Sequence, residues 1–238
     1  MMPIVAAALL LAGPPDVGAV LAAVFARVAA RDALITDACY RGDYRYREED
    51  AAGRLLREET CERVVYVKGE RQRVDFVSVT VNGRELEGRA RDRQIAALEK
   101  KGLVVSRANM PFVPEARDAY DYELLGTDSC SGLAAWVVGF TPRRRSQEMV
   151  VGRALVDRET GDVVRMEFRP ARLPWVCGET RMVLESAEMA GFWYPVRFEM
   201  EMKVRVRILV TLMSRTIRAE DRFSDYRFNT GLPDSVFK

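Results

Sequence analysis

The stretch VRFEMEMKVRVRILVTL, residues 196–212, decides the fold class of this chain. Every even-numbered position in it is apolar, and every odd position from Arg197 to Arg207 is charged. Side chains on a β-strand alternate between the two faces of a sheet, so this period of two predicts a strand with one dry face and one wet face. At roughly 3.3 Å per residue the run would be more than about 50 Å long, so it must bend, coil or fold back near Lys203. Because no Gly or Pro marks a turn there, we expect one long curved strand in a large antiparallel sheet around an apolar interior.

The composition indicates a globular protein without a strongly charged partner. The chain has 238 residues, of which 48% are hydrophobic, enough to bury a substantial core, and we expect residues 16–238 to form a single domain. Its 37 Lys and Arg against 35 Asp and Glu leave a net charge of +2, and both signs are spread along the sequence. Nucleic-acid binding has no support, because it usually needs a basic stripe that contacts phosphates.

The absence of histidine narrows the chemistry further. The chain contains no His at all, which excludes Ser-His-Asp and Cys-His catalysis and removes the commonest metal ligand. Cys39, Cys61, Cys130 and Cys177 are too far apart in sequence for paired CxxC zinc ligation. We therefore expect no catalytic residue, metal or cofactor; the alternative is a hydrolase that uses Asp or Glu, which mostly alternate with Arg on the predicted wet face.

The N-terminus is typical of an exported protein. Residues 3–12 form an uncharged apolar stretch with the length of a signal-peptide core, followed by Gly13-Pro14-Pro15. We expect a signal peptide over residues 1–15 and no transmembrane anchor, because the stretch is too short to span a bilayer. The mature protein is expected to be a periplasmic or secreted monomer.

An even number of cysteines in an oxidising compartment favours disulfides. A turn at residues 50–53 would bring Cys39 and Cys61 within about three residues of facing one another, which is within normal register error. Cys130 and Cys177 would then pair by elimination. The sequence alone leaves all three connectivities open.

Two helices and about eight to eleven strands are expected along the chain. Asp16 and the apolar spacing from Val17 to about Asp32 predict an amphipathic helix, and residues 89–101 predict a second, highly charged one. Alternating segments and turn signals, among them Asn82-Gly83, predict the strands. Arg143-Arg144-Arg145 follows Pro142 and indicates a hairpin loop, which is either simply solvated or binds an anionic lipid headgroup or a partner.

Several short motifs in the second half of the chain resemble those of a known group of bacterial envelope proteins. They are YELLG (122–126), CSG (130–132), WVVGFTP (136–142), GRALVD (152–157), ETG (159–161), GFWYP (191–195) and FSDYRF (223–228). With the order of the predicted elements, they resemble the LolA/LolB/RseB superfamily, which includes outer-membrane lipoprotein-sorting proteins. The resemblance covers about residues 17–228. It implies a mainly β (α+β) fold: one strongly curved antiparallel sheet, an open half-barrel, with both helices covering its concave side.

The resemblance also implies the function. In such a fold, an apolar cavity receives the acyl chains of lipoproteins or other lipids, whereas RseB-type members regulate through protein partners. We therefore expect a non-enzymatic envelope protein that binds a lipid or lipoprotein acyl chains. The alternative is an envelope-stress regulatory or assembly module that binds a protein partner.

Candidate cavity-lining side chains are large and apolar, and include methionines that adapt to a flexible chain. We name Trp136, Phe140, Met166, Phe168, Phe198, Met200 and Met202. The competing interpretation is that they form an ordinary core beneath the N-terminal helix. Phe192, Trp193 and Tyr194 lie in a turn and either form an exposed rim that guides an amphiphile or plug one end of the barrel.

Overall fold

The computed structural model describes residues 15–100, 109–173, 177–208 and 211–238. The predicted signal peptide therefore lies almost entirely outside the described residues. Two α-helices are present, α1 (Val17–Leu34) and α2 (Gly88–Lys100), together with the short 3-10 helices η2 (Pro114–Ala119) and η3 (Asp234–Phe237). Both predicted α-helices are confirmed to within about two residues at each end.

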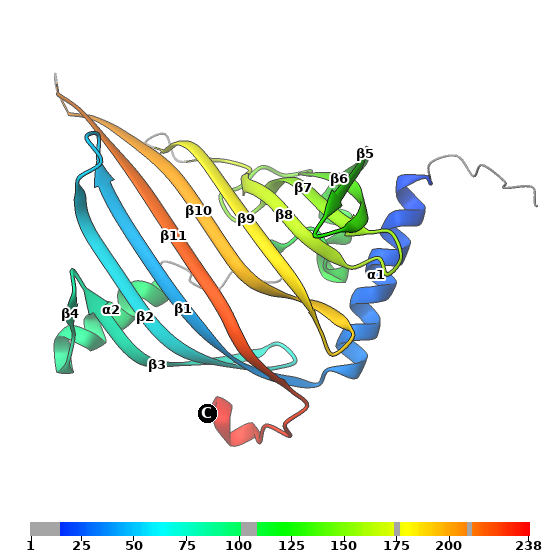
Figure 1. Cartoon of the computed structure of the whole chain (residues 1–238), viewed down its shortest axis with the longest axis horizontal. Coiled ribbons are helices and arrows are strands. Elements are labelled where there is room, and N and C mark those ends of the chain that lie inside the picture. The colour runs from blue at the N-terminus through cyan, green and yellow to red at the C-terminus, as the bar shows by residue number, and fades with distance from the viewer. Residues whose placement is uncertain (1–14, 101–108, 174–176, 209–210) are drawn as a thin grey trace, which may run out of the picture.

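Eleven strands of the described part of the chain form one antiparallel sheet (Figure 1). Their order across the sheet is β4-β3-β2-β1-β11-β10-β9-β8-β7-β6-β5. The strands are β1 (Asp37–Asp50), β2 (Leu55–Lys68), β3 (Arg71–Val81), β4 (Arg84–Glu85), β5 (Tyr120–Cys130), β6 (Leu133–Pro142), β7 (Val150–Asp157), β8 (Val163–Pro170), β9 (Cys177–Met189), β10 (Phe192–Ile208) and β11 (Thr211–Phe228).

The first and the last strand of the chain, β1 and β11, lie next to one another in the middle of the sheet. From β1 the chain runs outward through β2 and β3 to one edge, and it then continues through α2 and η2 to the opposite edge at β5. Six hairpin connections return it to β11, which pairs with β1 over most of their lengths. The mainly β class and the single antiparallel sheet are thus confirmed.

The stretch that predicted the sheet is not one strand. β10 ends at Ile208, which pairs directly with Thr211 at the start of β11. The chain therefore folds back within residues 196–212, about five positions later than the Lys203 that the sequence analysis considered. No Gly, Pro or Asn occupies positions 209 and 210, so the usual turn signals were missing.

The expected strong curvature is also wrong. Figure 1 shows an open, twisted sheet that does not curl up into a half-barrel. Adjacent strands rotate by roughly 20° relative to one another, and this twist accommodates long strands without closure. β10 alone spans 17 residues, as many as the run from 196 to 212, so a strand of the expected length is present without strong curling of the sheet.

Ion pairs connect neighbouring strands on one side of the sheet, which we call the outer face. Arginines and glutamates alternate across strand pairs there, and most of these side chains are at least partly exposed. Each exposed pair stabilises the fold by at most about 1 kcal/mol, so the main effect is a polar, nearly neutral surface. Examples are Arg153–Glu167 at 2.9 Å, Arg165–Glu185 at 3.0 Å, Arg197–Glu220 at 2.9 Å, Arg218–Glu49 at 2.6 Å and Arg45–Glu58 at 2.6 Å.

Candidate functional site

The opposite side of the sheet, the inner face, is apolar across ten strands. Residues that pair directly across strands share a face, so the strand register defines continuous rows of side chains. One such row, the central row, runs Leu124, Val138, Ala154, Met166, Leu184, Phe198, Asp221, Tyr44, Cys61 and Val79, from β5 to β3. At about 4.8 Å between strands it extends over roughly 43 Å. Asp221 is its only charged member.

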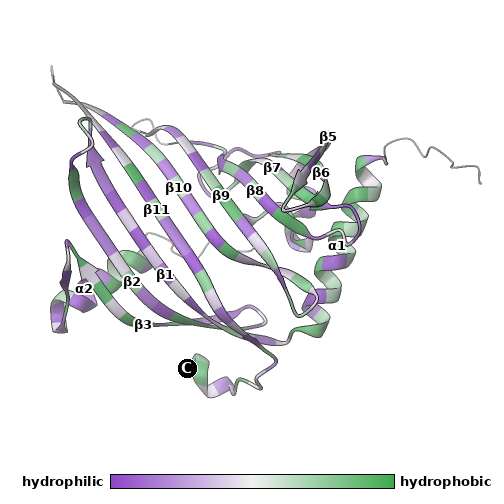
Figure 2. Ribbon diagram, viewed as in Figure 1, coloured by the Kyte–Doolittle hydropathy of each residue, from purple (hydrophilic) through white to green (hydrophobic). Residues whose placement is uncertain are grey.

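A second row beside the central one has the same character. It runs Tyr122, Phe140, Gly152, Phe168, Met182, Met200, Ala219, Tyr46, Glu59 and Val81. Five of the seven predicted cavity-lining residues belong to these two rows. The strand register therefore brings Phe140, Met166, Phe168, Phe198 and Met200 together on one face. Figure 2 shows hydrophobic and hydrophilic residues alternating along the central strands, as expected for a sheet with one apolar face.

Different parts of the chain cover the two ends of the inner face. On the β5–β8 side, Val20 and Val24 of α1 pack with Phe112 and Val113, from the segment that precedes η2, against the sheet. On the β2–β3 side, Leu98 and Ile95 of α2 pack with residues that include Val79. On β9 and β10, Met182, Leu184 and Phe198 pack against the first cluster and Met200 packs against the second, and these four side chains and Met202 are only partly buried. The middle of the inner face thus carries a partly exposed apolar stripe, which we call the β9–β10 stripe.

Helix α1 approaches the sheet closely because of a glycine. Gly161, in the turn between β7 and β8, has φ +78°, and a Cβ there would lie 3.1 Å from the carbonyl carbon of Ala23. Near this contact, Arg27 Nε donates a hydrogen bond to Asp162 Oδ2 at 2.7 Å, and the Arg27 guanidinium also bonds the Gly191 carbonyl oxygen. It lies 4.2 Å from the centre of the Phe192 ring. One arginine therefore ties α1 to two turns of the sheet.

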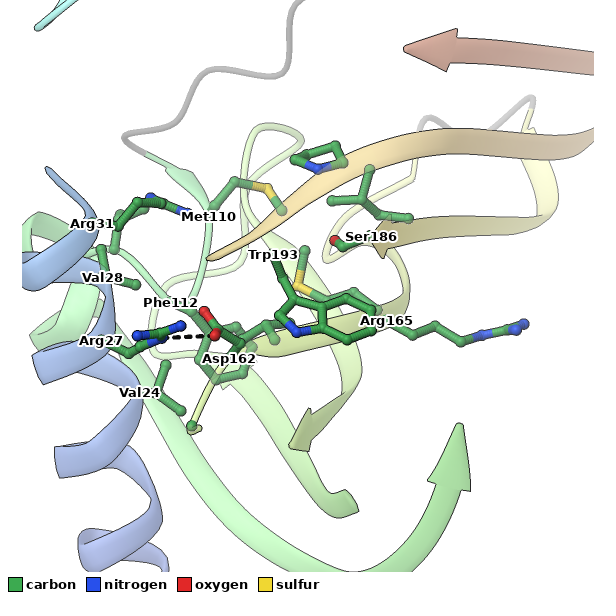
Figure 3. Close-up of a pocket in the computed structure, with 16 residues that line it drawn as sticks. Val24, Arg27, Val28, Arg31, Met110, Phe112, Asp162, Arg165, Ser186 and Trp193 are labelled. Atoms are coloured by element: carbon green, nitrogen blue, oxygen red, sulfur yellow. Dashed lines mark hydrogen bonds and ion pairs between the residues drawn. The ribbon is translucent and has the colours of Figure 1, made fainter. Parts of the chain in front are cut away.

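A cavity of about 130 Å³ lies between α1, residues 110–113 and strands β8 to β10 (Figure 3). Its apolar wall includes Val24, Val28, Met110, Phe112, Val113, Val163, Met166, Leu184, Trp193 and Pro195. The Arg27–Asp162 pair lies beside Trp193, and the Arg165 side chain extends away from the space (Figure 3). A dry cavity of roughly 150 Å³ holds a molecule the size of benzene, whereas ligand pockets usually measure about 300–1,000 Å³. As it stands, this cavity accommodates only the end of an acyl chain.

The predicted lining residues fall into two groups by exposure. Phe140, Met166 and Phe168 are buried in the core beneath α1 and Phe112. Phe198, Met200 and Met202 are half-buried in the β9–β10 stripe, and Trp136 is half-buried with the Arg158 guanidinium 3.7 Å from its ring centre. Of these seven, Met166 alone is among the residues that line the cavity.

The three aromatics expected in a turn form the start of β10, where they pack against other residues. Phe192 is buried beneath Arg27, and Trp193 lines the cavity. Tyr194 packs against Phe228, with ring centres 4.5 Å apart, and against Tyr226. Phe192 is therefore buried, and Trp193 and Tyr194 are partly buried.

Sequence reasoning missed the residues that α1 and the β7–β8 turn contribute. Val24 lies within the helix predicted from Val17 to about Asp32 but was not predicted to line a cavity, and Arg27 and Asp162 lie 135 positions apart in the sequence. The helix sequence did contain one signal for this part of the site, namely the spacing of Val20, Val24, Arg27 and Arg31 on α1. It places the two arginines one turn apart, next to the apolar stripe.

A buried ion pair interrupts the apolar inner face. Arg63 on β2 reaches over β1 to Asp221 on β11, and the two side chains are 2% and 4% exposed. It crosses β1 at Gly42, where a Cβ would lie 2.9 Å from Arg63 Cζ. Burial raises the pKa of Asp221, although the Arg63 guanidinium beside it acts in the opposite direction. Within the described residues, Asp221 Oδ1 and Arg63 Nε and Nη1 have no hydrogen-bond partner.

The predicted disulfides are wrong, because all four cysteines are free. Cys39 pairs across the hairpin with Tyr66, and Cys61 pairs with Tyr44, so the two cysteines are offset by five positions. At about 3.3 Å per residue this offset is far beyond the reach of a disulfide. Burial raises the pKa of the Cys61 thiol to about 11.

Two further observations concern metals and membranes. Within residues 15–100, 109–173, 177–208 and 211–238, no group of three or more Cys, Asp or Glu side chains is arranged to hold a metal ion. Neither α-helix of this described part has the length and hydropathy of a membrane span.

Comparisons with known proteins find similarity in structure only. No protein-family model and no curated protein sequence matches the chain. Among solved structures, a DUF1329 family protein from Desulfovibrio piger is 14% identical, with a TM-score of 0.49, and the match covers 94% of this chain and 98% of that one. A LolA superfamily protein from Nitrosomonas europaea is 13% identical, with a TM-score of 0.38 and the same coverages. The MucA/MucB complex of Pseudomonas aeruginosa matches at 14% identity and a TM-score of 0.27, over 92% of this chain and 96% of that one. These matches include the superfamily that the sequence motifs resemble.

Proposed function

We propose that this chain is an exported, non-enzymatic protein of the bacterial envelope that binds the apolar part of a lipid or the acyl chains of a lipoprotein. The observation that carries the proposal is the β9–β10 stripe. Leu184, Phe198 and Met200 lie in the middle of an otherwise covered apolar face and remain partly exposed. A surface of this kind is typical of a binding site.

One residue, Leu184, belongs both to the β9–β10 stripe and to the wall of the cavity beneath α1. Leu184 lines the cavity and pairs directly with Phe198 in the stripe. The end of an acyl chain therefore enters the cavity, and the rest of the chain lies along β9 and β10. The unbranched Met182 and Met200, which pair with one another, suit a flexible ligand.

Apolar contact is the main source of affinity that the stripe and the cavity offer such a ligand. Covering about 200 Å² of apolar surface, at about 25 cal/mol per Å², is worth about 5 kcal/mol before the costs of association. Binding of this kind needs no cofactor, metal or catalytic group. We propose that the protein acts as a monomer and that its specificity comes from the shape of the inner face.

Displacement of a fluorescent fatty acid tests the proposal. Phe198→Asn places a polar group in the stripe, whereas the control Glu199→Gln changes the neighbouring side chain on the outer face. We expect Phe198→Asn to weaken probe binding at least ten-fold and Glu199→Gln to leave it unchanged. Leu184→Asn provides a second inner-face variant, and circular dichroism confirms that each variant is folded.

Mass spectrometry of lipid extracts from the wild-type protein, purified without detergent, gives a second readout. Co-purifying lipid and displacement of the probe support the proposal. If the wild type carries no lipid and binds no probe, lipid binding is refuted. The competing function, an envelope regulatory or assembly module that binds a protein partner, predicts that negative result.

A further inference from the structure

Two loops at one end of the sheet lie side by side. The β6–β7 connection covers residues 143–149, and the β8–β9 connection begins at residue 171. Ala171 N donates a hydrogen bond to Met149 O at 2.8 Å, and Arg172 N donates one to Ser146 O at 3.1 Å. Ser146 Oγ accepts a hydrogen bond from Met149 N at 3.1 Å and orders the first loop. Residues 143–149 and 171–173 therefore form one surface.

This surface concentrates exposed arginines. Arg143, Arg144 and Arg145 come from the first loop, and Arg169 and Arg172 lie at the end of β8 and just after it; all five are exposed. We call these five residues the arginine edge. The sequence shows only the first three as a cluster, and the strand register adds the other two.

Most of the arginine edge is not neutralised. Arg143 pairs with Asp121 at 2.9 Å. Within the part of the chain that the structure describes, no ion pair involves the other four arginines, unlike those that alternate with glutamates on the outer face. Glu148 lies in the same loop as the first three arginines. Glu167, two positions before Arg169, forms its ion pairs with Arg153, Arg165 and Arg181. An excess of positive charge remains, although the chain as a whole carries only +2.

We propose that the arginine edge docks the protein on an anionic phospholipid surface. Guanidinium groups bind phosphate oxygens with two parallel hydrogen bonds, and arginines spread over two loops match a plane of many phosphates better than one soluble anion. Leu173, half-buried beside Arg172, provides an apolar contact at the same surface. The inference deepens the proposed function, on which it rests: a protein that takes its ligand from a bilayer, or delivers it there, needs a transient contact with that bilayer.

Sedimentation with phospholipid vesicles tests this docking. The wild-type protein is mixed at low salt with vesicles of phosphatidylcholine alone or with 30 mol% phosphatidylglycerol. Each arginine near an anionic surface contributes about a five-fold increase in partitioning. We expect binding to the anionic vesicles only, and Arg144→Ser/Arg145→Ser/Arg172→Ser to weaken it on the order of 100-fold. The control Arg84→Ser/Arg89→Ser/Arg93→Ser removes the same charge from exposed positions on β4 and α2 and is expected to lose much less.

Salt and competitors distinguish the alternatives. Salt screens exposed charges over about 10 Å at 0.1 M. Binding to the anionic vesicles should therefore fall steeply when the salt concentration is raised from about 0.05 to about 0.5 M. Equal binding to neutral vesicles, or equal losses in the two triple variants, overturns the proposal. Preferential binding of polyglutamate over vesicles of equal charge overturns it as well and indicates a protein partner.

The two proposals fail in different ways. The arginine-edge variant should still bind the fluorescent fatty acid, since its substitutions lie outside the inner face. Phe198→Asn should still bind anionic vesicles. If the wild type binds the fatty-acid probe but not the anionic vesicles, only the docking proposal is refuted. If it binds the vesicles but not the probe, only the ligand site is refuted.

Discussion

The Arg63–Asp221 pair predicts a large, conditional loss of stability. Replacing Arg63 by Met removes the only partner that the structure shows for a carboxylate 4% exposed in the middle of the central row. Breaking a buried ion pair from one side costs about 3–5 kcal/mol, because the remaining charge is left without compensation. Arg63→Met should therefore lower the free energy of unfolding by about 4 kcal/mol, and Asp221→Leu by a similar amount.

The double variant gives the opposite expectation. With both charges gone, the introduced methionine and leucine side chains would continue the apolar row, and replacing a buried pair by apolar residues is often neutral or stabilising. We expect Arg63→Met/Asp221→Leu to be more stable than either single variant and within about 1 kcal/mol of the wild type. Gly42→Ala tests the geometry, because its Cβ would lie 2.9 Å from Arg63 Cζ and displace the guanidinium.

Urea denaturation, followed by circular dichroism and tryptophan fluorescence, measures these changes. With a slope of about 2.5 kcal/mol per M, a loss of 4 kcal/mol shifts the midpoint by roughly 1.5 M. Coincident transitions by the two probes establish that unfolding is two-state. A single-variant loss below about 1 kcal/mol, or a double variant no more stable than the worse single one, refutes the reasoning.

Three further predictions concern other parts of the fold. Burial acts to raise the pKa of Asp37, but hydrogen bonds from Thr230, Gly231 and Leu232 together lower it below 3.8, so the stability that Asp37 contributes is present above pH 3.8 and is lost as pH falls through the lower folded-state pKa. In Asp37→Asn, urea midpoints measured against pH should therefore lack this part of the loss of stability in acid. A pH profile identical to that of the wild type contradicts this role of Asp37. Gly152→Ala should destabilise by about 3 kcal/mol or more, because its Cβ would lie 2.7 Å from Phe168 Cα and force β7 and β8 apart; a thermal melt close to that of the wild type would contradict this close approach. Thiol titration in urea without reductant should find four free cysteines. In the native protein, the half-buried Cys130 and Cys177 should react before the buried Cys39 and Cys61. A count below four in urea would show a disulfide.

Local patterns in the sequence predicted the elements well where one strong physical rule acted. Alternation in residues 196–208 predicted β10, Asn82-Gly83 ended β3, and the apolar spacing that includes Val20 and Val24 predicted α1. Each of these signals depends only on neighbouring residues. Helix and strand periodicities therefore recovered most of the fold.

Features that depend on distant parts of the chain could not be predicted. The return after Ile208 lacks turn residues, and the five-position offset of Cys39 and Cys61 follows from the register set by the hairpin turn. Arg63 and Asp221 are 158 positions apart in the sequence, so nothing local connects them. The candidate site was predicted as a face of the sheet, whereas its cavity depends on where α1 and residues 110–113 lie.

The pairing of β1 with β11 also determines the order in which this protein can fold. Partners across that seam are about 165 to 190 positions apart, from Asp50 with Arg215 to Ala38 with Phe228. Contacts at such separations carry the largest loop-closure entropy and form slowly. The hairpins of β1–β3 and of β5–β11 can form early, but the seam closes only after nearly the whole chain has left the ribosome. Until then β1 and β11 expose unpaired edges, so this chain stays available to chaperones until its synthesis is nearly complete.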